Sequence, residues 1–246
     1  MNCIEVKDLR KIFPGGLLEK DREILRGISF KVRQGKVTGF VGANGSGKTT
    51  TLKCVLGFIF PNSGEVRFFE GEKLGPSALR RIGFFPERPY LYEFLTAGEY
   101  LHLHWELSGG GPGFVEAREW VLKEVNLAGV ENRRLRSFSK GMLQRIGIAQ
   151  AIIRKPEFLI LDEPMSGLDP DGRLLMKDIL RSLHKGGTSI FFSSHLLHDL
   201  EELCEDLIII EKGELLFTGE LKDLRQQYPK MNLEEIFREM KKGISK

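Results

Sequence analysis

The chain has few cysteines and no long apolar run, and both absences limit what it can be. Its three cysteines, Cys3, Cys54 and Cys204, lie far apart and match neither a metal-binding pair nor a disulfide framework. We therefore expect a reducing compartment. No window approaches the roughly 18 consecutive apolar residues of a membrane-spanning helix, and residues 1–5 lack the apolar core of a signal peptide. The sequence thus predicts a soluble chain that needs a partner or its surface to associate with a membrane.

The charge balance is mild and shows no dense basic run. The 246 residues include 37 Lys and Arg against 34 Asp and Glu, a formal net charge of +3. This balance does not indicate binding to nucleic acid, and none is expected. The C-terminal cations are predicted to form a solvated tail; they are Lys230, Arg238, Lys241, Lys242 and Lys246.

Strand and helix patterns alternate along most of the chain. Strands are predicted at residues 4–9, 24–32, 37–41, 65–69, 82–85, 158–161 and 189–192, with a hairpin at 207–211 and 214–218. Helices are predicted at residues 49–58, 97–107, 115–125, 140–153 and 232–241, the last with Asn232 as N-cap. Alternation of this kind is typical of an α/β fold with a mainly parallel sheet. The helical block at about 89–153 interrupts it and is interpreted as an inserted subdomain.

The strongest motif is the glycine-rich segment Gly42-Ala43-Asn44-Gly45-Ser46-Gly47-Lys48-Thr49, hereafter the phosphate loop. It matches G-x-x-x-x-G-K-[ST] and lies between a predicted strand and a predicted helix, as the motif requires. Its backbone N–H groups can point at phosphate oxygens, and the start of the helix adds a favourable potential. Lys48 is predicted to reach the β- and γ-phosphates and Thr49 to ligate Mg²⁺, and Thr50 is counted with the loop as a nucleotide contact.

A second motif consists of two adjacent carboxylates that follow the apolar run 158–161. Open α/β sheets bind their ligands at the carboxyl ends of strands, where Asp162 and Glu163 fall. Asp162 suits Mg²⁺ binding through water, and Glu163 suits the polarisation of an attacking water as general base.

With these motifs in this order, nearly the whole chain resembles the ATP-binding subunits of ABC transporters. Phe138-Ser139-Lys140-Gly141-Met142 is similar to the family's L-S-G-G-Q signature. The resemblance implies a P-loop NTPase core with a mainly parallel sheet, an N-terminal antiparallel β portion and an inserted helical subdomain. It implies a nucleotide-binding domain at 1–228 and a short helical tail at 229–246.

The resemblance also implies roles for single residues. Ser139 and Gly141 would contact the γ-phosphate held by an opposite subunit, and Asp169, in Ser166-Gly167-Leu168-Asp169, would couple the two sites of a dimer. His195 matches the histidine that hydrogen-bonds the γ-phosphate. Phe13 stands where the family stacks an aromatic on adenine, although a core phenylalanine explains this position almost as well.

Two local features depart from the family pattern. Glu87 stands where the family usually has a glutamine that ligates Mg²⁺ and senses the membrane partner. A carboxylate there can still ligate Mg²⁺, but the position also fits a plain surface link. Leu107-Ser108-Gly109-Gly110 spells a closer match to the signature, but Gly111-Pro112-Gly113 follows it, so it is interpreted as an interhelical loop.

Together the resemblances imply a subunit that binds and hydrolyses ATP with Mg²⁺ and drives substrate movement, with export favoured, through separate transmembrane permease subunits. Two such subunits, identical or paralogous, would sandwich two nucleotides. The chain would then lie in the cytoplasm, peripheral to the inner face of the cell membrane.

Three other functional hypotheses are compared with this one. A soluble ABC ATPase acting on nucleic acid or ribosomes usually carries a duplicated cassette, a long coiled coil or zinc fingers, and none is visible. A P-loop GTPase would need an N-K-x-D motif, and neither a GTPase nor a P-loop kinase explains the Ser139 segment. An inactive binding module conflicts with the intact Lys48, Asp162, Glu163 and His195.

Overall fold

The computed structural model describes residues 1–16 and 20–242, which divide into two compact units. The first unit comprises residues 1–78 and 191–246, and the second comprises residues 79–190. The predicted helical block at 89–153 falls inside the second unit, and its limits stay a prediction. Residues 17–19, which lie between the first two predicted strands, are outside the described residues, as are residues 243–246 of the predicted tail.

An antiparallel sheet and part of a second sheet build the first unit. The antiparallel sheet has the strand order β2-β1-β4, and in the other sheet β7, β3, β8 and β9 follow one another. β3 and β8 are parallel, whereas β8 and β9 form an antiparallel hairpin. The strands of this unit are β1 (Asn2–Phe13), β2 (Arg22–Arg33), β3 (Val37–Val41), β4 (Ser63–Phe68), β7 (Ser189–Ser194, which starts in the second unit), β8 (Asp206–Glu211) and β9 (Glu214–Glu220).

Phenylalanines fill the core of this unit where its sheets meet. The ring of Phe40 in β3 lies 5.8 Å from that of Phe30 in β2 and 5.6 Å from that of Phe191 in β7. All three side chains are almost completely buried. Burial of such large apolar side chains contributes roughly 2–3 kcal/mol each relative to exposure.

Among the described residues, five helices belong wholly or partly to the first unit. They are α1 (Lys48–Val55), α2 (Pro76–Arg80, which ends in the second unit), α7 (Leu197–Leu203), α8 (Leu221–Gln227) and α9 (Leu233–Lys242). The predicted capping of α9 is confirmed, because Asn232 Oδ1 accepts from the N–H of Glu235 at 2.9 Å and Glu235 Oε2 accepts from the N–H of Asn232 at 2.9 Å.

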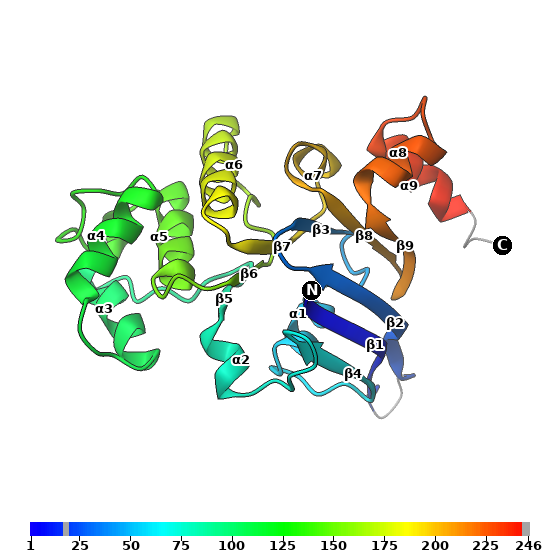
Figure 1. Cartoon of the computed structure of the whole chain (residues 1–246), viewed down its shortest axis with the longest axis horizontal. Coiled ribbons are helices and arrows are strands. Elements are labelled where there is room, and N and C mark those ends of the chain that lie inside the picture. Colours follow the sequence, from blue (N-terminus) through cyan, green and yellow to red (C-terminus); the bar gives the residue numbers. More distant parts are fainter. Residues whose placement is uncertain (17–19, 243–246) are drawn as a thin grey trace. The chain divides into compact units, whose positions relative to one another are not determined.

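The second unit combines two parallel strands with a group of helices. β5 (Ile82–Phe85) pairs with β6 (Phe158–Leu161), and Figure 1 shows three of the helices, α3, α4 and α5, side by side. Its helices are α3 (Ala97–Leu107), α4 (Phe114–Glu124), the 3₁₀ turn Leu135–Ser137, α5 (Lys140–Ile152) and α6 (Pro170–Lys185). The guanidinium of Arg154 stacks on the ring of Trp105 at 3.4 Å, which fastens the end of α5 to α3.

The predicted α/β class, with parallel strands and an N-terminal antiparallel sheet, is confirmed. β1 and β2 are longer than the apolar pattern indicated. Their extra length includes charged residues, and one cross-strand ion pair lies there, Arg10 with Glu23 at 3.6 Å.

Among the described residues, no helix combines the length and apolar character that a membrane span requires. All three cysteines are free and buried, as the prediction of no disulfide framework requires. Burial raises the pKa of the Cys54 thiol to about 11.

Candidate functional site

The phosphate loop connects the end of β3 to the start of α1 through a tightly packed backbone. A Cβ atom on Gly42 would lie 2.3 Å from the carbonyl oxygen of Ile210, so only glycine fits there. Gly47, the N-cap of α1, has φ 113°, a conformation that L side chains rarely adopt. The first three N–H groups of the helix have no acceptor within it, because its first intrahelical bond runs from the Thr51 N–H to the Gly47 carbonyl. The loop thus offers donors for an anion.

Lys48 is buried within this loop, with 6% of its surface exposed. Its ammonium group donates a 2.8 Å hydrogen bond to the carbonyl oxygen of Gly42. Close by, Ser46 Oγ is buried and has no hydrogen-bond partner among the described residues. Burial of a cation is costly, as is a buried hydroxyl that lacks a partner, and a phosphate can bind both groups.

Two more predicted site residues belong to the first unit. His195 is exposed and directly follows β7, the neighbour of β3 in the sheet, so His195 and the phosphate loop follow neighbouring strands. Ser194 Oγ accepts from the N–H of Leu196 at 3.0 Å and fixes the turn around His195. Phe13, at the end of β1, is 39% exposed, and Lys11 Nζ lies 5.0 Å from its ring centroid. Its ring is therefore accessible rather than in the core.

The two carboxylates of the second unit come directly after β6. Asp162 and Glu163 have 3% and 8% of their surfaces exposed. The N–H of Asp162 donates to the carbonyl oxygen of Phe85 at 2.8 Å, which holds it against the end of β5. Glu163 has φ 50°, a conformation that costs a non-glycine residue on the order of 1–3 kcal/mol and that often marks functional sites.

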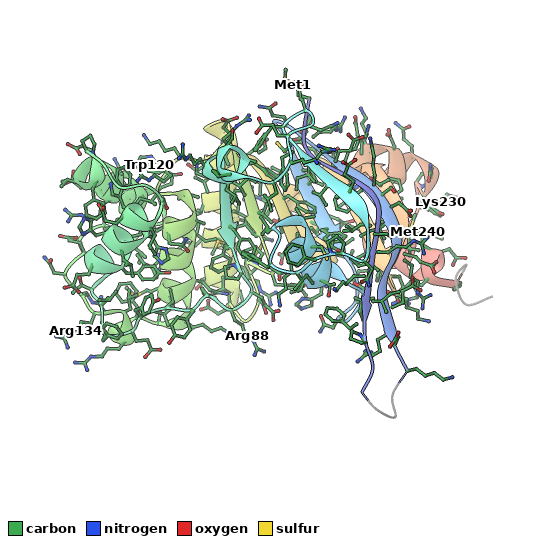
Figure 2. All side chains as sticks on the ribbon, turned by 90° about the horizontal axis from the view of Figure 1, so that it is seen from below. Met1, Arg88, Trp120, Arg134, Lys230 and Met240 are labelled. Atoms are coloured by element: carbon green, nitrogen blue, oxygen red, sulfur yellow. The ribbon has the colours of Figure 1, made fainter. Side chains whose placement is uncertain are left out.

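Glu87 follows β5 and lines a hollow of about 370 Å³. Because β5 and β6 are parallel neighbours, Glu87 and Asp162 both follow carboxyl ends at the same edge of the sheet. Arg88 also lines this hollow and projects outward from the unit in Figure 2.

The sequence reasoning did not single out Gln144, which joins this hollow to the segment after the carboxylates. Its Nε2 donates to the carbonyl oxygen of Ser166 at 2.9 Å. Its Oε1 is buried and has no partner within the described part of the chain. The available signal was a polar residue on the buried face of a largely apolar helix, α5.

Ser139 and Asp169 cap two different helices that open on one hollow. Ser139 Oγ accepts from the N–H of Met142 at 3.3 Å at the start of α5, and Asp169 Oδ1 accepts from the N–H of Gly172 at 3.0 Å at the start of α6. Both residues, with Gly141, line a cavity of about 470 Å³. The second unit therefore brings these three predicted residues together.

The competing match at residues 107–110 is an interhelical loop, as predicted. It connects α3 to α4, and the Gly110 carbonyl oxygen accepts from Arg154 Nη2 at 2.6 Å. Trp105 Nε1 donates to the carbonyl oxygen of Gly111 at 3.0 Å. The glycines of this segment thus support the α3–α4 connection.

Comparison with known proteins decides the family. The sequence profile described as ABC transporter matches residues 25–166, which include the phosphate loop, the two carboxylates and the Ser139 segment. The chain belongs to the ABC transporter ATPase family.

Similar proteins agree with this assignment. The chain is 42% identical to an uncharacterised ABC transporter ATP-binding protein of Nostoc sp. over 233 residues, covering 91% of the chain and 68% of that protein. It is 42% identical over 193 residues to the bacitracin transport ATP-binding protein BcrA of Bacillus licheniformis, covering 77% of the chain and 62% of BcrA. A solved ATP-binding subunit of an ABC transporter superimposes with a TM-score of 0.80 at 31% identity, covering 97% of the chain and 99% of that subunit.

The chain spans about two thirds of the length of the two curated relatives. As a member of the family, this ABC ATPase is an ATP-binding subunit that hydrolyses ATP.

Proposed function

We propose that this ABC ATPase drives the export of a substrate through separate transmembrane permease subunits, to which it binds at the inner face of the membrane. The family membership and the similarity to a protein named for bacitracin transport support a transport role. Export is favoured by three sequence features that resemble the exporter branch of the family: the S-K-G-M signature, Glu87 in place of glutamine and the closing segment 232–237.

The observation that carries the proposal is the phosphate loop with Lys48 buried inside it. Lys48 would exchange the Gly42 carbonyl for the β- and γ-phosphates of ATP, a stronger, charge-assisted partner. Residues Gly42 to Thr50 would surround the triphosphate, and the accessible ring of Phe13 would stack on adenine.

The donor set fits Mg²⁺, which accompanies the nucleotide in our proposal. The side chains assigned to it, Thr49, Asp162 and Glu87, all offer oxygen, the ligand that Mg²⁺ prefers. The described residues contain no group of three His, Cys, Asp or Glu side chains that could hold a metal by itself. This agrees with an ion that protein and nucleotide hold jointly, as Mg²⁺ usually is in ATPases. When bound, Mg²⁺ neutralises charge on the β- and γ-phosphates.

Hydrolysis is assigned to Glu163 and His195. Glu163 would orient a water molecule and accept its proton as the water oxygen bonds to the γ-phosphorus and the bond to the β-γ bridging oxygen breaks. His195 would hydrogen-bond the γ-phosphate and position the water. The products are ADP and inorganic phosphate. The φ of 50° at Glu163 supports a residue held for function at a cost in stability.

A second copy or a paralogue would complete each site. The hollow lined by Ser139, Gly141 and Asp169 lies at the starts of α5 and α6, where helix N-termini favour an anion. We assign this hollow to the γ-phosphate of the nucleotide that the opposite subunit binds. Closure of the two subunits around ATP would drive the permease, and hydrolysis would reset them.

The test is the substitution Glu163→Gln, with Glu119→Gln on the exposed face of α4 as a matched control. We expect Glu163→Gln to lower ATP turnover by about 100-fold or more, as loss of a general base does, while ATP binding persists. Gel filtration of this variant with MgATP should show a dimer. Full turnover would disprove the assignment of Glu163, and a strict monomer at high concentration would contradict the shared site. Co-purification with a multi-span membrane protein tests the transport role.

A further inference from the structure

The hairpin of β8 and β9 supports the phosphate loop directly. At its turn, the N–H of Gly213 donates a 2.9 Å hydrogen bond to the carbonyl oxygen of Ser46. The Ile210 carbonyl oxygen packs against Gly42 so closely that a Cβ atom there would lie 2.3 Å away. A displacement of this turn would therefore move the phosphate loop.

Glu211, the last residue of β8, places a buried carboxylate at this turn. The residue is 7% exposed, and its Oε2 has no hydrogen-bond partner among the described residues. Its Oε1 lies 3.0 Å from Nζ of Lys241 in α9. A buried carboxylate is costly without a cation, so Lys241 compensates a charge that lies two residues from the Gly213 N–H. Lys241 thus has a structural partner, whereas the sequence predicted a solvated tail.

The helix that carries Lys241 is anchored elsewhere as well. Leu233 and Ile236 are buried, and α9 packs against α7, the helix that follows His195. The N–H of Leu233 donates to Glu201 Oε1 in α7 at 3.0 Å. Met240, labelled in Figure 2, directly precedes Lys241 on this helix, and Lys241 Nζ lies 4.9 Å from the ring centroid of Phe237. The ammonium group is therefore held in place at the hairpin.

We propose that Lys241 and Glu211 form a positioning pair that sets the affinity of the phosphate loop for ATP, so that α9 regulates nucleotide binding. Neither residue touches the nucleotide in this proposal. Without Lys241, the uncompensated carboxylate displaces the turn toward solvent and adds a negative potential near the bound phosphates. Both effects weaken ATP binding. The inference rests on the assignment of Gly42–Thr49 as the nucleotide loop under Proposed function.

The experiment compares Lys241→Met with Lys242→Met in the full chain. Lys242 is the neighbouring cation, but it pairs only with Glu239 of its own helix at 2.6 Å among the interactions of the described residues. Calorimetric titration with MgATP should show Lys241→Met binding about threefold to tenfold more weakly, the order of effect expected from one uncompensated charge near the phosphates at intermediate dielectric constant. Lys242→Met should bind like the original chain. The KM for ATP should rise in Lys241→Met while kcat stays unchanged.

Two further variants separate positioning from general damage. Lys241→Arg should keep the original affinity, and Lys241→Met with Glu211→Gln should recover it, because the uncompensated charge is removed. Equal affinity in Lys241→Met and the original chain, an equal loss in Lys242→Met, or no recovery in the double variant would each overturn the proposal. Lys48→Ala serves as the reference for the loop itself: if it still bound ATP normally, the loop assignment would fail whatever Lys241 does.

Discussion

The ammonium group of Lys48 donates a 2.8 Å hydrogen bond to the carbonyl oxygen of Gly42, the first residue of the loop that Lys48 closes. The side chain is buried, so its charge has lost most of its hydration. A phosphate entering the loop would accept a charge-assisted hydrogen bond from this ammonium group. The contact between Lys48 and Gly42 therefore couples the free-energy cost of burying the Lys48 charge to the free energy of nucleotide binding.

From this relationship we predict that Lys48→Met lowers ATP turnover by about 100-fold or more, because one charged donor to the phosphates is lost. Methionine retains the length and the apolar stem of lysine, so the fold should persist. The matched control is Lys53→Met, an exposed lysine of the same helix, which should leave turnover unchanged. Steady-state phosphate release measures both, and equal activities in the two variants would refute the role of Lys48.

The signature assignment can be tested with two serines. Ser139 caps α5. Ser108 belongs to the competing match at residues 107–110, and its hydroxyl donates to the His104 carbonyl oxygen at 2.7 Å in the α3–α4 connection. We predict that Ser139→Ala lowers ATP turnover and lowers the free energy of unfolding by about 1 kcal/mol through loss of the cap. Ser108→Ala should leave turnover unchanged.

A third variant separates the cap from the phosphate contact. Ser139→Asp keeps a capping acceptor and should keep the stability, but its charge repels the γ-phosphate proposed to bind there. Turnover in Ser139→Asp should therefore fall at least as far as in Ser139→Ala. If Ser139→Asp remained fully active, or if Ser108→Ala were less active than Ser139→Ala, the assignment of the signature would be wrong.

Much of the candidate site could be predicted because its motifs are local. A glycine-rich loop between a strand and a helix, or carboxylates at the end of an apolar strand, need only neighbouring residues to be recognised. The competing segment at 107–110 could be rejected for the same reason, since the sequence after it cannot begin a helix. β3, β5, β6 and α3 have the predicted bounds because each is a clear apolar or periodic run between breakers.

The rest depends on contacts between residues far apart in the chain. Gln144 bonds to Ser166 across 22 positions, and Lys241 pairs with Glu211 across 30 positions of hairpin and helix. Neither pair leaves a periodic signal in the sequence. The positive φ of Glu163 could not be predicted either, because glutamate normally avoids that conformation and only the surrounding fold imposes it. The short helices α2, α7 and α8 have too few turns for a periodic pattern.

Two glycines of α5, the helix that begins at the signature, are predicted to change the free energy of unfolding in opposite directions when each is replaced by alanine. A Cβ atom on Gly147 of α5 would lie 2.6 Å from Cε2 of the buried Phe85, whereas one on Gly141 would lie 3.6 Å from Leu168 Cδ2, an ordinary contact. We predict that Gly147→Ala lowers the free energy of unfolding by about 1–3 kcal/mol through overpacking. Gly141→Ala should raise it by up to about 1 kcal/mol, because alanine favours helix.

Urea unfolding measures both changes in stability. The effect on ATP turnover is not expected to follow the effect on stability. Gly141→Ala should reduce ATP turnover despite its greater stability, since the added methyl group enters the hollow shared with Ser139 and Asp169. A stabilised Gly141→Ala with full turnover would contradict the proposed phosphate contact, and a stabilised Gly147→Ala would contradict the packing of α5 on β5.

The departure at Glu87 yields a prediction about the metal. If Glu87 ligates Mg²⁺, Glu87→Gln removes one negative charge from the ligand set, and the Mg²⁺ concentration for half-maximal turnover should rise by about threefold to tenfold. The matched control is Glu93→Gln, an exposed carboxylate six residues further along the same segment. Turnover is measured against free Mg²⁺ at saturating ATP, and ATP binding is measured without Mg²⁺ to detect general damage. An unchanged Mg²⁺ midpoint with normal binding would show that Glu87 is a surface link between β5 and the helices, the alternative that its exposure on the hollow also permits.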